Sequence, residues 1–416
     1  MGRAILLVDM NAFFISCEMS RNPALKGKPA AVAGDPKNRT GIILTANYEA
    51  RKYKIKTTML VHEAKKLCPD LILIPPDHEF YEQKSREVMN ILRRYSPVIE
   101  QNSIDEAWLD ITGCEVLFGT PVEIAQKIMK DIMNELDLWC SIGISENKFL
   151  AKMASEMKKP LGITEVWQKD VKEKIWPLPV REMYGIGRQT EKKLSNLAIY
   201  TIGDLACCDR KLLTKNLGKW GEELQKLANG IDLSPVTEHP HHDSKSISRS
   251  TTLPRDITDI DEAKTVLLRL SEEVGAEARA YGYKGRTVSI TIKYKDFHSI
   301  TRQKSINPTY LTRDIYRTGI SLLEENWDKH RPVRLLGIGL DNFNDSDDME
   351  RQISLFDIME EADSSTSGSR VREENLEKAI DSIRAKYGKD IVKRAKVIGN
   401  NLISSSSAEK KNPFSI

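Results

Sequence analysis

Hydrophobic residues follow two different periods in the first third of the chain. The run "RAILLVD" is apolar throughout, as in a buried strand, whereas "EFYEQKSREVMNILRRY" has the 3.6-residue period of an amphipathic helix. Two short β-like runs, "PVIEQN" and "EAWLDI", come next and are joined at Ser103 to Asp105. A helical pattern in "PVEIAQKIMKDIMNEL" and a strand in "LWCSIGI" complete the series. This order of strand, helix, two strands, helix, strand predicts a ferredoxin-like fold.

The remaining chain divides into a helical unit and a second α+β unit. From Trp167 to about Asp232 the pattern is helical, and "DLSPVTEHPHHDSK" has no apolar period and two prolines, as expected of a linker. Beyond it, "KSISRSTTL", "RTVSITIKY", "HSITRQKSI" and "RPVRLLGIGL" predict strands. Helices are expected in "DEAKTVLLRLSEEVGAEARAY", in "TRDIYRTGISLLEEN" and, after a serine-rich hinge, in "SRVREENLEKAIDSIRAKYGKDIVKRA".

Composition narrows the class of protein. With 416 residues, 40% hydrophobic and 30% charged, the chain is expected to form a soluble multidomain protein, and no run reaches the roughly 18 apolar residues of a membrane helix. "AILLVD" follows a single Arg3 and ends in Asp9 with no small-residue cleavage site, so a strand is favoured over a signal peptide and a cytoplasmic protein is expected. A net charge of +3 is too small to indicate a polyanion partner, so any contact with nucleic acid must depend on local charge.

Three acidic residues fall at one predicted edge of the first sheet. Asp105 and Glu106 lie at or beside the hairpin turn, where strand alternation no longer separates them, and Asp9 ends the neighbouring first strand. Hard carboxylate ligands of this kind suit Mg²⁺, which prefers one or two carboxylates together with phosphates and water. The alternative is a solvated turn, since an adjacent Asp–Glu pair is common. The third acid on the same predicted sheet raises the case for a metal site to about that for a solvated turn, so both interpretations stay open.

Five segments, in order, resemble the signatures of a known family. "LVDMNAFFISCE", "TANYEARK", "SIDEAWLD", "GISENKFLAKMAS" and "KKPLGI" are similar to successive motifs of the Y-family, the translesion DNA polymerases, and the bacterial DNA polymerase IV branch in particular. The resemblance extends to about Asp357. It implies an α+β multidomain fold: a ferredoxin-like palm with a small fingers insertion, a helical thumb with a helix-hairpin-helix, and a C-terminal α+β little finger.

The resemblance also assigns active-site residues. Asp9, Asp105 and Glu106 match the catalytic, metal-binding carboxylates, with the Met10 carbonyl as a further ligand, and imply two Mg²⁺ ions that assist attack of a primer 3′-hydroxyl on a nucleotide. Asn11 stands where many relatives have an acid, so we exclude it from the ligands. The residues that match the family's nucleotide-binding set are Phe13, Phe14, Thr45, Tyr48, Arg51 and Lys159.

Phe14 matches the steric gate, an aromatic ring under the sugar that leaves no room for a 2′-hydroxyl. Taken without the resemblance, the pair Phe13 and Phe14 favours core packing. "TANYEARK" by itself favours the start of a surface helix. The sugar-gate and triphosphate roles therefore depend on the family resemblance.

Primer-template DNA is the expected partner of the later domains. "MYGIGRQTEKKL" resembles a helix-hairpin-helix loop in which Gly185 and Gly187 let backbone amides approach a phosphate, and Gly218 and Gly221 form a second pair. Ordinary turns between helices are the alternative. Strand alternation in the little finger is expected to bring several basic residues onto one face toward the DNA backbone, unless that face is merely solvated: Arg249, Arg286, Lys293, Lys295, Arg302 and Lys304.

A short acidic stretch near the end contains "QISLFD", which resembles the motif by which bacterial polymerases bind the sliding clamp, with Gln352, Leu355 and Phe356 as anchors. No function is assigned to the extension beyond it. The expected boundaries are palm 1–18 and 78–166, fingers 19–77, thumb 167–231, linker 232–244, little finger 245–342, acidic segment 343–363 and extension 364–416.

The leading hypothesis is a monomeric, Mg²⁺-dependent translesion DNA polymerase that uses deoxynucleoside triphosphates and has no segment for a proofreading exonuclease. A non-catalytic DNA- and clamp-binding accessory protein is the second hypothesis, and the intact acids argue against it. A cyclase-like palm that acts on nucleotides without DNA is the third, and the thumb-like and basic features disfavour it.

Overall fold

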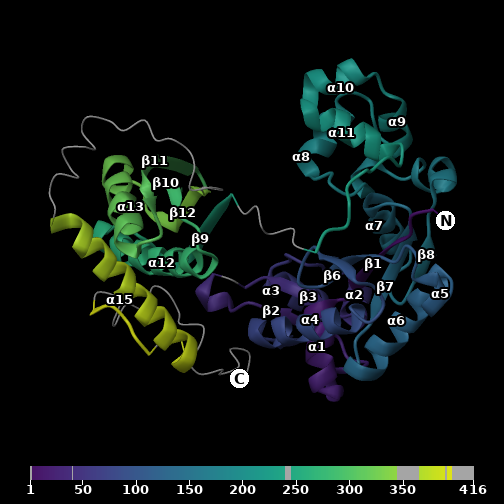
Figure 1. The fold of residues 1–416 in the computed structure, drawn as a ribbon, viewed down its shortest axis with the longest axis horizontal. Helices are drawn as coiled ribbons and strands as arrows, with labels where there is room; N and C mark the ends of the chain where they lie inside the picture. Colours follow the sequence, from purple (N-terminus) through teal and green to yellow (C-terminus); the bar gives the residue numbers. More distant parts are fainter. Residues whose placement is uncertain (1, 40, 239–244, 344–364, 389–390, 396–416) are drawn as a thin grey trace. The chain divides into compact units, whose positions relative to one another are not determined.

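The computed structural model describes residues 2–39, 41–238, 245–343, 365–388 and 391–395 (Figure 1). The chain divides into two compact units, one made of Met1–Gly34 and Ile42–His242 and the other of Asp35–Gly41 and Asp243–Ser415. The first unit contains the predicted palm, fingers and thumb, and the second contains the predicted little finger. Within the described residues, no helix is long and apolar enough to cross a membrane.

The palm is a five-stranded sheet in the order β5-β6-β1-β7-β8. Its strands are β1 (Ile5–Met10), β5 (Val98–Gln101), β6 (Glu106–Asp110), β7 (Cys140–Ser145) and β8 (Ile163–Glu165). The first four have the predicted ferredoxin-like order, and β8 adds a parallel strand beside β7. The expected fold class is therefore confirmed for the palm.

Helices cover both faces of the palm sheet. One face packs against α4 (His78–Leu92) and α6 (Pro121–Leu136). The pattern of α6 predicts one apolar face, on which Leu136 is partly buried and three residues are fully buried: Ile124, Ile128 and Ile132. Helix α6 begins where it does because Thr120 and Glu123 form a reciprocal cap before Pro121. The other face packs against α7 (Lys148–Met157).

Helix α7 crosses the sheet at Gly143 of β7 with almost no clearance. A Cβ atom on Gly143 would lie only 1.9 Å from the carbonyl oxygen of Ala151, so this position requires glycine. The close crossing places the middle of α7 directly over β1 and β7. Any side chain on the inner face of α7 therefore reaches the sheet edge that carries the acids.

The fingers form a small layer of their own. A three-stranded sheet in the order β3-β2-β4 is built from β2 (Ala30–Ala33), β3 (Ile43–Ala46) and β4 (Ile72–Ile74). Its helices and those that connect it to the palm are α1 (Phe13–Arg21), α2 (Tyr48–Lys52) and α3 (Val61–Leu67), with short turns η1 (Pro23–Leu25) and η2 (Pro36–Asn38). Helix α5 (Glu115–Phe118) follows β6 in the palm.

The thumb is helical throughout, as predicted. Its core is closed by apolar residues such as Leu194, Leu205 and Leu224. The elements are η3 (Gln168–Asp170), η4 (Val171–Ile175), η5 (Val180–Glu182), α8 (Arg188–Ser195), α9 (Ile202–Cys207), α10 (Arg210–Leu217) and α11 (Lys219–Ala228).

The little finger is a four-stranded antiparallel sheet in the order β11-β10-β12-β9, with two helices on one face. The elements are β9 (Ser246–Ile257), α12 (Ile260–Tyr281), β10 (Gly285–Tyr294), β11 (Ser299–Thr309), α13 (Thr312–Asn326) and β12 (Val333–Phe343). Every strand and helix predicted here is present. Gly282, at φ +74°, ends α12 in the left-handed conformation that glycine adopts without strain.

The C-terminal extension contributes α15 (Ser365–Tyr387), which packs against α12 of the little finger (Figure 1). A helix was predicted here, but its mode of attachment is unusual because charged residues face the domain. Glu377 is 3% exposed and accepts hydrogen bonds from Thr312 and Arg279, while Asp381 also pairs with Arg279. Apolar residues of the same helix, such as Leu376 and Tyr387, are exposed.

Candidate active site

Asp9 and Glu106 lie directly opposite each other on neighbouring strands. The register of β1 against β6 pairs Asp9 with Glu106 and Leu7 with Trp108. Opposite residues of an antiparallel pair share a face, so both acids project to the side of the sheet that Leu7, Trp108 and α7 occupy. The predicted convergence of these two acids at one sheet edge is therefore present in the fold.

Asp105 lies in the hairpin turn, one residue before β6 begins. Its backbone carbonyl accepts a hydrogen bond from the amide of Met10 at 2.9 Å, and its carboxylate accepts one from the Ser103 hydroxyl at 2.6 Å. Burial raises the pKa of the Asp105 carboxyl, and the neighbouring charges of Asp9 and Glu106 raise it further. The turn thus holds the third acid within electrostatic range of the other two.

Lys152 on the inner face of α7 bridges the acids. Its Nζ donates to Asp9 Oδ2 at 2.8 Å, to Glu106 Oε2 at 2.6 Å and to Glu156 Oε1 at 3.0 Å. Burial lowers the pKa of Lys152, but the carboxylates of Asp9 and Glu106 outweigh burial and raise it above the ordinary lysine value. Lys152 is therefore a buried cation at the centre of an acidic cluster.

Lys159, which the sequence assigned to the nucleotide, also reaches this cluster. Its Nζ donates to Asp9 Oδ1 at 2.8 Å and to Glu156 Oε1 at 2.9 Å. Sequence reasoning missed Lys152 and Glu156. Their signal was the spacing of Lys148, Lys152 and Glu156 at intervals of four residues, which puts all three on one side of a helix.

The donor chemistry of the three acids fits a divalent cation, but their present arrangement does not surround one. Among the described residues, no group of three or more His, Cys, Asp or Glu side chains is placed around a common point that could hold a metal ion. The ammonium group of Lys152 lies between the oxygens of Asp9 and Glu106 instead. The structure therefore shows the predicted ligands as neighbours with a lysine between two of them.

Asn11, where many relatives carry an acid, has a structural role. It is buried, its side-chain amide donates to the Ser141 hydroxyl at 3.0 Å, and its amide oxygen accepts from the backbone of Leu161 at 3.0 Å. Leu161 follows Lys159 by two residues, so Asn11 fastens the segment that carries this lysine. These contacts are consistent with leaving Asn11 out of the metal ligands.

Tyr48 and Arg51 come together on α2, the short helix that follows Thr45 of β3. Asn47 caps this helix by accepting from Ala50, and the Arg51 guanidinium lies 4.9 Å from the centre of the Tyr48 ring. Burial raises the pKa of the Tyr48 hydroxyl, which also senses the charges of Arg51, Lys159 and Asp9. "TANYEARK" thus begins a short helix whose first turn faces the acidic cluster.

The Tyr48 hydroxyl is buried and has no hydrogen-bond partner in the part of the chain that the structure describes. A buried hydroxyl without a partner costs free energy on the order of 1–3 kcal/mol, so its retention indicates a partner that arrives with a ligand. Lys159 and Arg51 supply positive charge nearby. An anionic group is therefore the ligand that this corner best accommodates.

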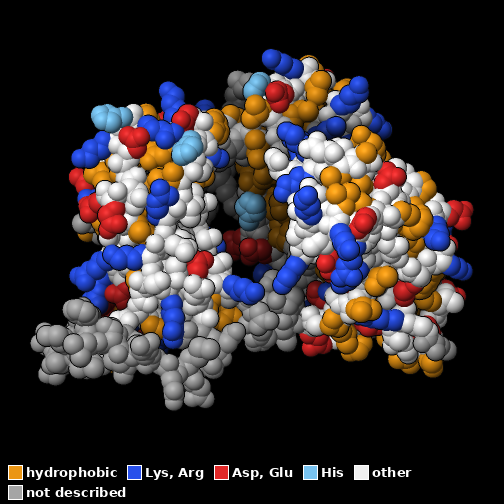
Figure 2. Space-filling model, turned by 90° about the horizontal axis from the view of Figure 1, so that it is seen from above, with side chains coloured by type: hydrophobic (Ala, Val, Ile, Leu, Met, Phe, Trp, Pro, Cys, Tyr) orange, Lys and Arg blue, Asp and Glu red, His pale blue; other side chains and the backbone are white. Residues whose placement is uncertain are grey.

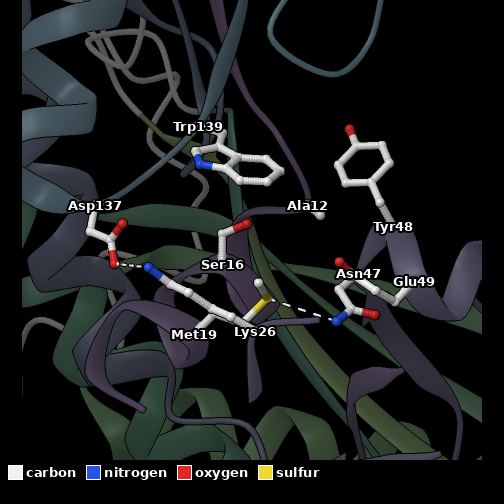
Figure 3. A pocket seen from close by; sticks show the side chains of 9 residues that line it. All are labelled: Ala12, Ser16, Met19, Lys26, Asn47, Tyr48, Glu49, Asp137 and Trp139. Atoms are coloured by element: carbon white, nitrogen blue, oxygen red, sulfur yellow. Dashed lines mark hydrogen bonds and ion pairs between the residues drawn. The ribbon is translucent and has the colours of Figure 1, made fainter. Parts of the chain in front are cut away.

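A small pocket opens on one side of Tyr48, between α1, α2 and the segment before β7 (Figure 3). Trp139 and Met19 supply apolar surface to it, and an ion pair between Lys26 and Asp137 lies at its edge. Figure 3 shows the Tyr48 ring and the Trp139 ring on either side of Ala12. The pocket borders the nucleotide residues but contains none of the three acids.

Phe13 and Phe14 have different environments. Phe13 is buried in the palm core, as the packing alternative expected. Phe14 is partly buried and stacks on Tyr81, with ring centres 4.5 Å apart and planes 13° apart, while His78 meets its edge. Tyr81 is in turn fixed by donating to Glu18 at 2.6 Å. The Phe14 ring is thus held rigidly with one side unburied.

The four thumb glycines fall into two groups: two precede helices, and two allow close packing. Gly187 and Gly218 precede α8 and α11, and neither helix has a side-chain cap, so their first amides remain available. Gly185, at φ +90°, packs against Trp220, which brings the two hairpin loops together. Gly221 lies inside α11, where a Cβ would approach the Leu213 carbonyl to 2.7 Å, so it serves helix packing.

The strand register divides the basic residues of the little finger between the two faces of its sheet. Lys293 points to the open face of the sheet, away from the apolar side of Ile290 and Ile292. Arg302 is opposite Ile290 and donates to Asn326 of α13, and Arg249 pairs with Glu277 of α12, so both belong to the helix side. Arg249 and Arg302 therefore share one face while Lys293 lies on the other, and contact of these residues with the DNA backbone stays a prediction.

A bulge and a set of polar side chains form the surroundings of Arg286 and Lys293. Arg286 lies at the irregularity between Gly285 and Thr287, and its Nε is buried without a partner in the described residues. Small polar residues fill the open face around Lys293: Ser246, Ser248, Ser250, Thr252, Ser289, Thr291, Ser299, Thr301, Gln303 and Ser305, with Gly337 and Gly339. Figure 2 likewise shows Lys and Arg scattered among acidic and apolar side chains on the face it presents.

The clamp-motif residues Gln352, Leu355 and Phe356 lie outside the described residues. The chain leaves the little finger at Phe343 and is described again from Ser365.

Comparisons with known proteins agree along the whole chain. The family model impB/mucB/samB matches residues 8–156, its C-terminal domain matches residues 244–355, and the helix-hairpin-helix motif of the same family matches residues 169–199. DNA polymerase IV of Clostridium kluyveri is 60% identical over 96% of this chain and 99% of its own length. DNA polymerase IV of Alkaliphilus oremlandii is 52% identical over 96% of this chain and all of its own length.

A solved Y-family DNA polymerase chimera has the same fold, with a TM-score of 0.73 and 30% identity over 82% of this chain and 99% of the chimera. Palm, helix-hairpin-helix thumb and little finger are therefore confirmed as the architecture. The comparisons also decide between the enzyme and the accessory-protein hypotheses in favour of the enzyme. The chain belongs to the Y-family DNA polymerases, within the DNA polymerase IV group, and is a DNA-directed DNA polymerase of the translesion type.

Proposed function

We propose that Asp9, Asp105 and Glu106, with the Met10 carbonyl, hold two Mg²⁺ ions at the palm edge. The observation that carries this proposal is the register that sets Asp9 opposite Glu106, with Asp105 in the adjoining turn. When bound, the ions supply Lewis acidity and charge for nucleotidyl transfer to the primer. The acids themselves provide hard oxygen donors on one rigid sheet edge, which is the preorganisation that such a reaction requires.

The groups around Tyr48 are proposed to bind the triphosphate. Lys159 and Arg51 carry positive charge that phosphate oxygens attract, and the Tyr48 hydroxyl offers a neutral donor that has no protein partner. Thr45, near the end of the neighbouring strand, adds a hydroxyl. Together these residues orient the phosphates toward the acids, so that the leaving pyrophosphate is already neutralised.

Phe14 is proposed as the sugar gate. Phe14→Ala should raise incorporation of ribonucleotides relative to deoxynucleotides by about 10²-fold, because the stacked ring that fills the space at C2′ is removed while no acid is touched. Single-nucleotide insertion with matched ribo- and deoxynucleotides measures the ratio. The test measures selection between ribose and deoxyribose and therefore reports directly on the proposed nucleotide site.

Phe14→Tyr is the matched control, since it keeps the ring on Tyr81 and should retain the wild-type ratio. An unchanged ratio in Phe14→Ala, with deoxynucleotide insertion intact, would place the nucleotide sugar elsewhere.

For primer-template DNA, we propose two kinds of contact. The uncapped amides of α8 and α11 in the thumb suit phosphate groups at helix N-termini. On the little finger, the open sheet face offers hydroxyl groups and Lys293 in place of a row of cations. Hydroxyl and backbone donors fix the position of DNA without reading its bases, as a polymerase that copies any sequence requires.

The motif "QISLFD" is proposed to bind the sliding clamp. Replacing Gln352, Leu355 and Phe356 by alanine should leave single-nucleotide insertion unchanged and abolish the gain in long products when the clamp is loaded on DNA. Buried Leu355 and Phe356 would each contribute roughly 1.5–3 kcal/mol to clamp binding. Primer extension with and without loaded clamp measures the difference.

Ile353→Ala, within the same stretch but not among the proposed anchors, serves as control and should keep most of the clamp stimulation. Equal stimulation of the wild type and the triple variant would show that "QISLFD" is a chance match.

A further inference from the structure

Lys152 occupies the place between two proposed metal ligands. Its ammonium group bonds to Asp9 Oδ2 and Glu106 Oε2, the oxygens that face each other across β1 and β6. The lysine ammonium group is a compact positive charge that can neutralise two carboxylates. A metal ion cannot bind the same oxygens while the ammonium group lies between them. The oxygens that a metal ion would need are thus already engaged.

We propose that Lys152 occupies the carboxylate oxygens of Asp9 and Glu106 in the metal-free enzyme and is displaced from them when a divalent cation binds. This inference rests on the proposed metal site and adds a positioning residue to it. It explains why three neighbouring acids do not surround a common point in this structure. Without Lys152, Asp9 would retain its ion pair with Lys159, but the largely buried Glu106 opposite it would lose its lysine partner.

Helix α7 also provides the place to which Lys152 can move. Glu156 lies one turn further along α7, is half exposed and already accepts from Lys152 at 3.0 Å. A small rotation of the lysine side chain can keep this bond while releasing the other two. Lys152 therefore remains paired with a carboxylate in both arrangements, which keeps the free-energy cost of the exchange small.

Lys148 provides a matched control on the same helix. One turn before Lys152, its Nζ donates to both oxygens of Glu100 at 2.8 Å, and it lies 5.0 Å from the centre of the Trp108 ring. Lys148 therefore resembles Lys152 in position, burial and pairing with a carboxylate. It contacts none of the three proposed ligands in the described residues.

The test is binding of Mn²⁺ alone to the full-length protein, followed by electron paramagnetic resonance. Lys152→Met should bind Mn²⁺ roughly 10- to 100-fold more tightly than the wild type, because the cation no longer has to break one or two charge-assisted hydrogen bonds. Lys152→Arg retains a competing cation and should not gain affinity. Lys148→Met should bind Mn²⁺ as the wild type does.

A second measurement, thermal unfolding, tests whether Lys152 stabilises the acids in the absence of metal and whether Mg²⁺ replaces it. In thermal unfolding without metal, Lys152→Met should melt below the wild type, and added Mg²⁺ should raise its melting temperature more than that of the wild type. Equal Mn²⁺ affinity, or an equal rise with Mg²⁺, would overturn displacement while leaving the metal site intact. If neither protein bound Mn²⁺, the proposed metal site itself would fail, and this inference with it.

Discussion

Asp105→Asn and Glu106→Gln should each lower nucleotide incorporation on the order of 10³-fold, because each removes one negative charge from the metal site without removing volume. The fold and the affinity for primer-template DNA should stay nearly unchanged, since each amide has the volume of the acid it replaces and Lys152 keeps its bonds to Asp9 and Glu156. Single-turnover primer extension measures the loss. Chelation of divalent ions should abolish incorporation by the wild type in the same assay.

Asp110→Asn is the control for these variants. Asp110 is the last residue of the same strand, and its ion pair with Arg3 is 3.6 Å long and lies at the other end of β6 from the acids. It should retain incorporation within a few-fold of the wild type. Near-normal incorporation in both Asp105→Asn and Glu106→Gln would refute the assignment of the three acids.

Arg279→Met should release helix α15 from the little finger. The side chain of Arg279 is 5% exposed and is bonded to Glu377 and Asp381, so its loss leaves a buried carboxylate without its main partner. Breaking a buried pair in this way costs about 3–5 kcal/mol. That cost corresponds to roughly 10²-fold or faster amide exchange, which hydrogen–deuterium exchange over residues 371–387 of the full-length protein detects.

Arg313→Met is the comparison for Arg279→Met, because Arg313 pairs with Glu373 of the same helix while more than a third exposed. An exposed pair is worth at most about 1 kcal/mol, so exchange in α15 should change little. Protection of α15 in Arg279→Met that equals the wild type would show that other contacts hold the helix. Insertion of a nucleotide should be unaffected in both variants.

Hydrophobic periodicity was enough to predict the strands and helices of the palm and the little finger, because their buried positions follow the strand and helix periods without interruption. The apolar stripe of α6 and the continuous run of β1 are examples, and both are buried as predicted. Strand order then brought Asp9 beside the hairpin that carries Asp105 and Glu106. The acids could therefore be placed together from topology alone.

Lys152 could not be placed in the same way. Its position depends on how closely α7 crosses the sheet, and that distance is set by the single glycine at position 143. The orientation of Arg249 and Arg302 depends on the pairing register of the little-finger strands, which the alternation of one strand does not reveal. Helix α15 inverts the usual rule, since Glu377 is buried and Leu376 is exposed.

The docking of α15 gives the proposed clamp motif two attachment points on the little finger. The segment that carries "QISLFD" is attached by β12 at Phe343 and by α15 from Ser365 onward. Gln352 follows Phe343 by nine residues and Phe356 precedes Ser365 by nine, so each side of the motif spans at most about 30 Å when extended. Binding of the clamp through this motif, as proposed above, would therefore keep the clamp within roughly 30 Å of both attachment points.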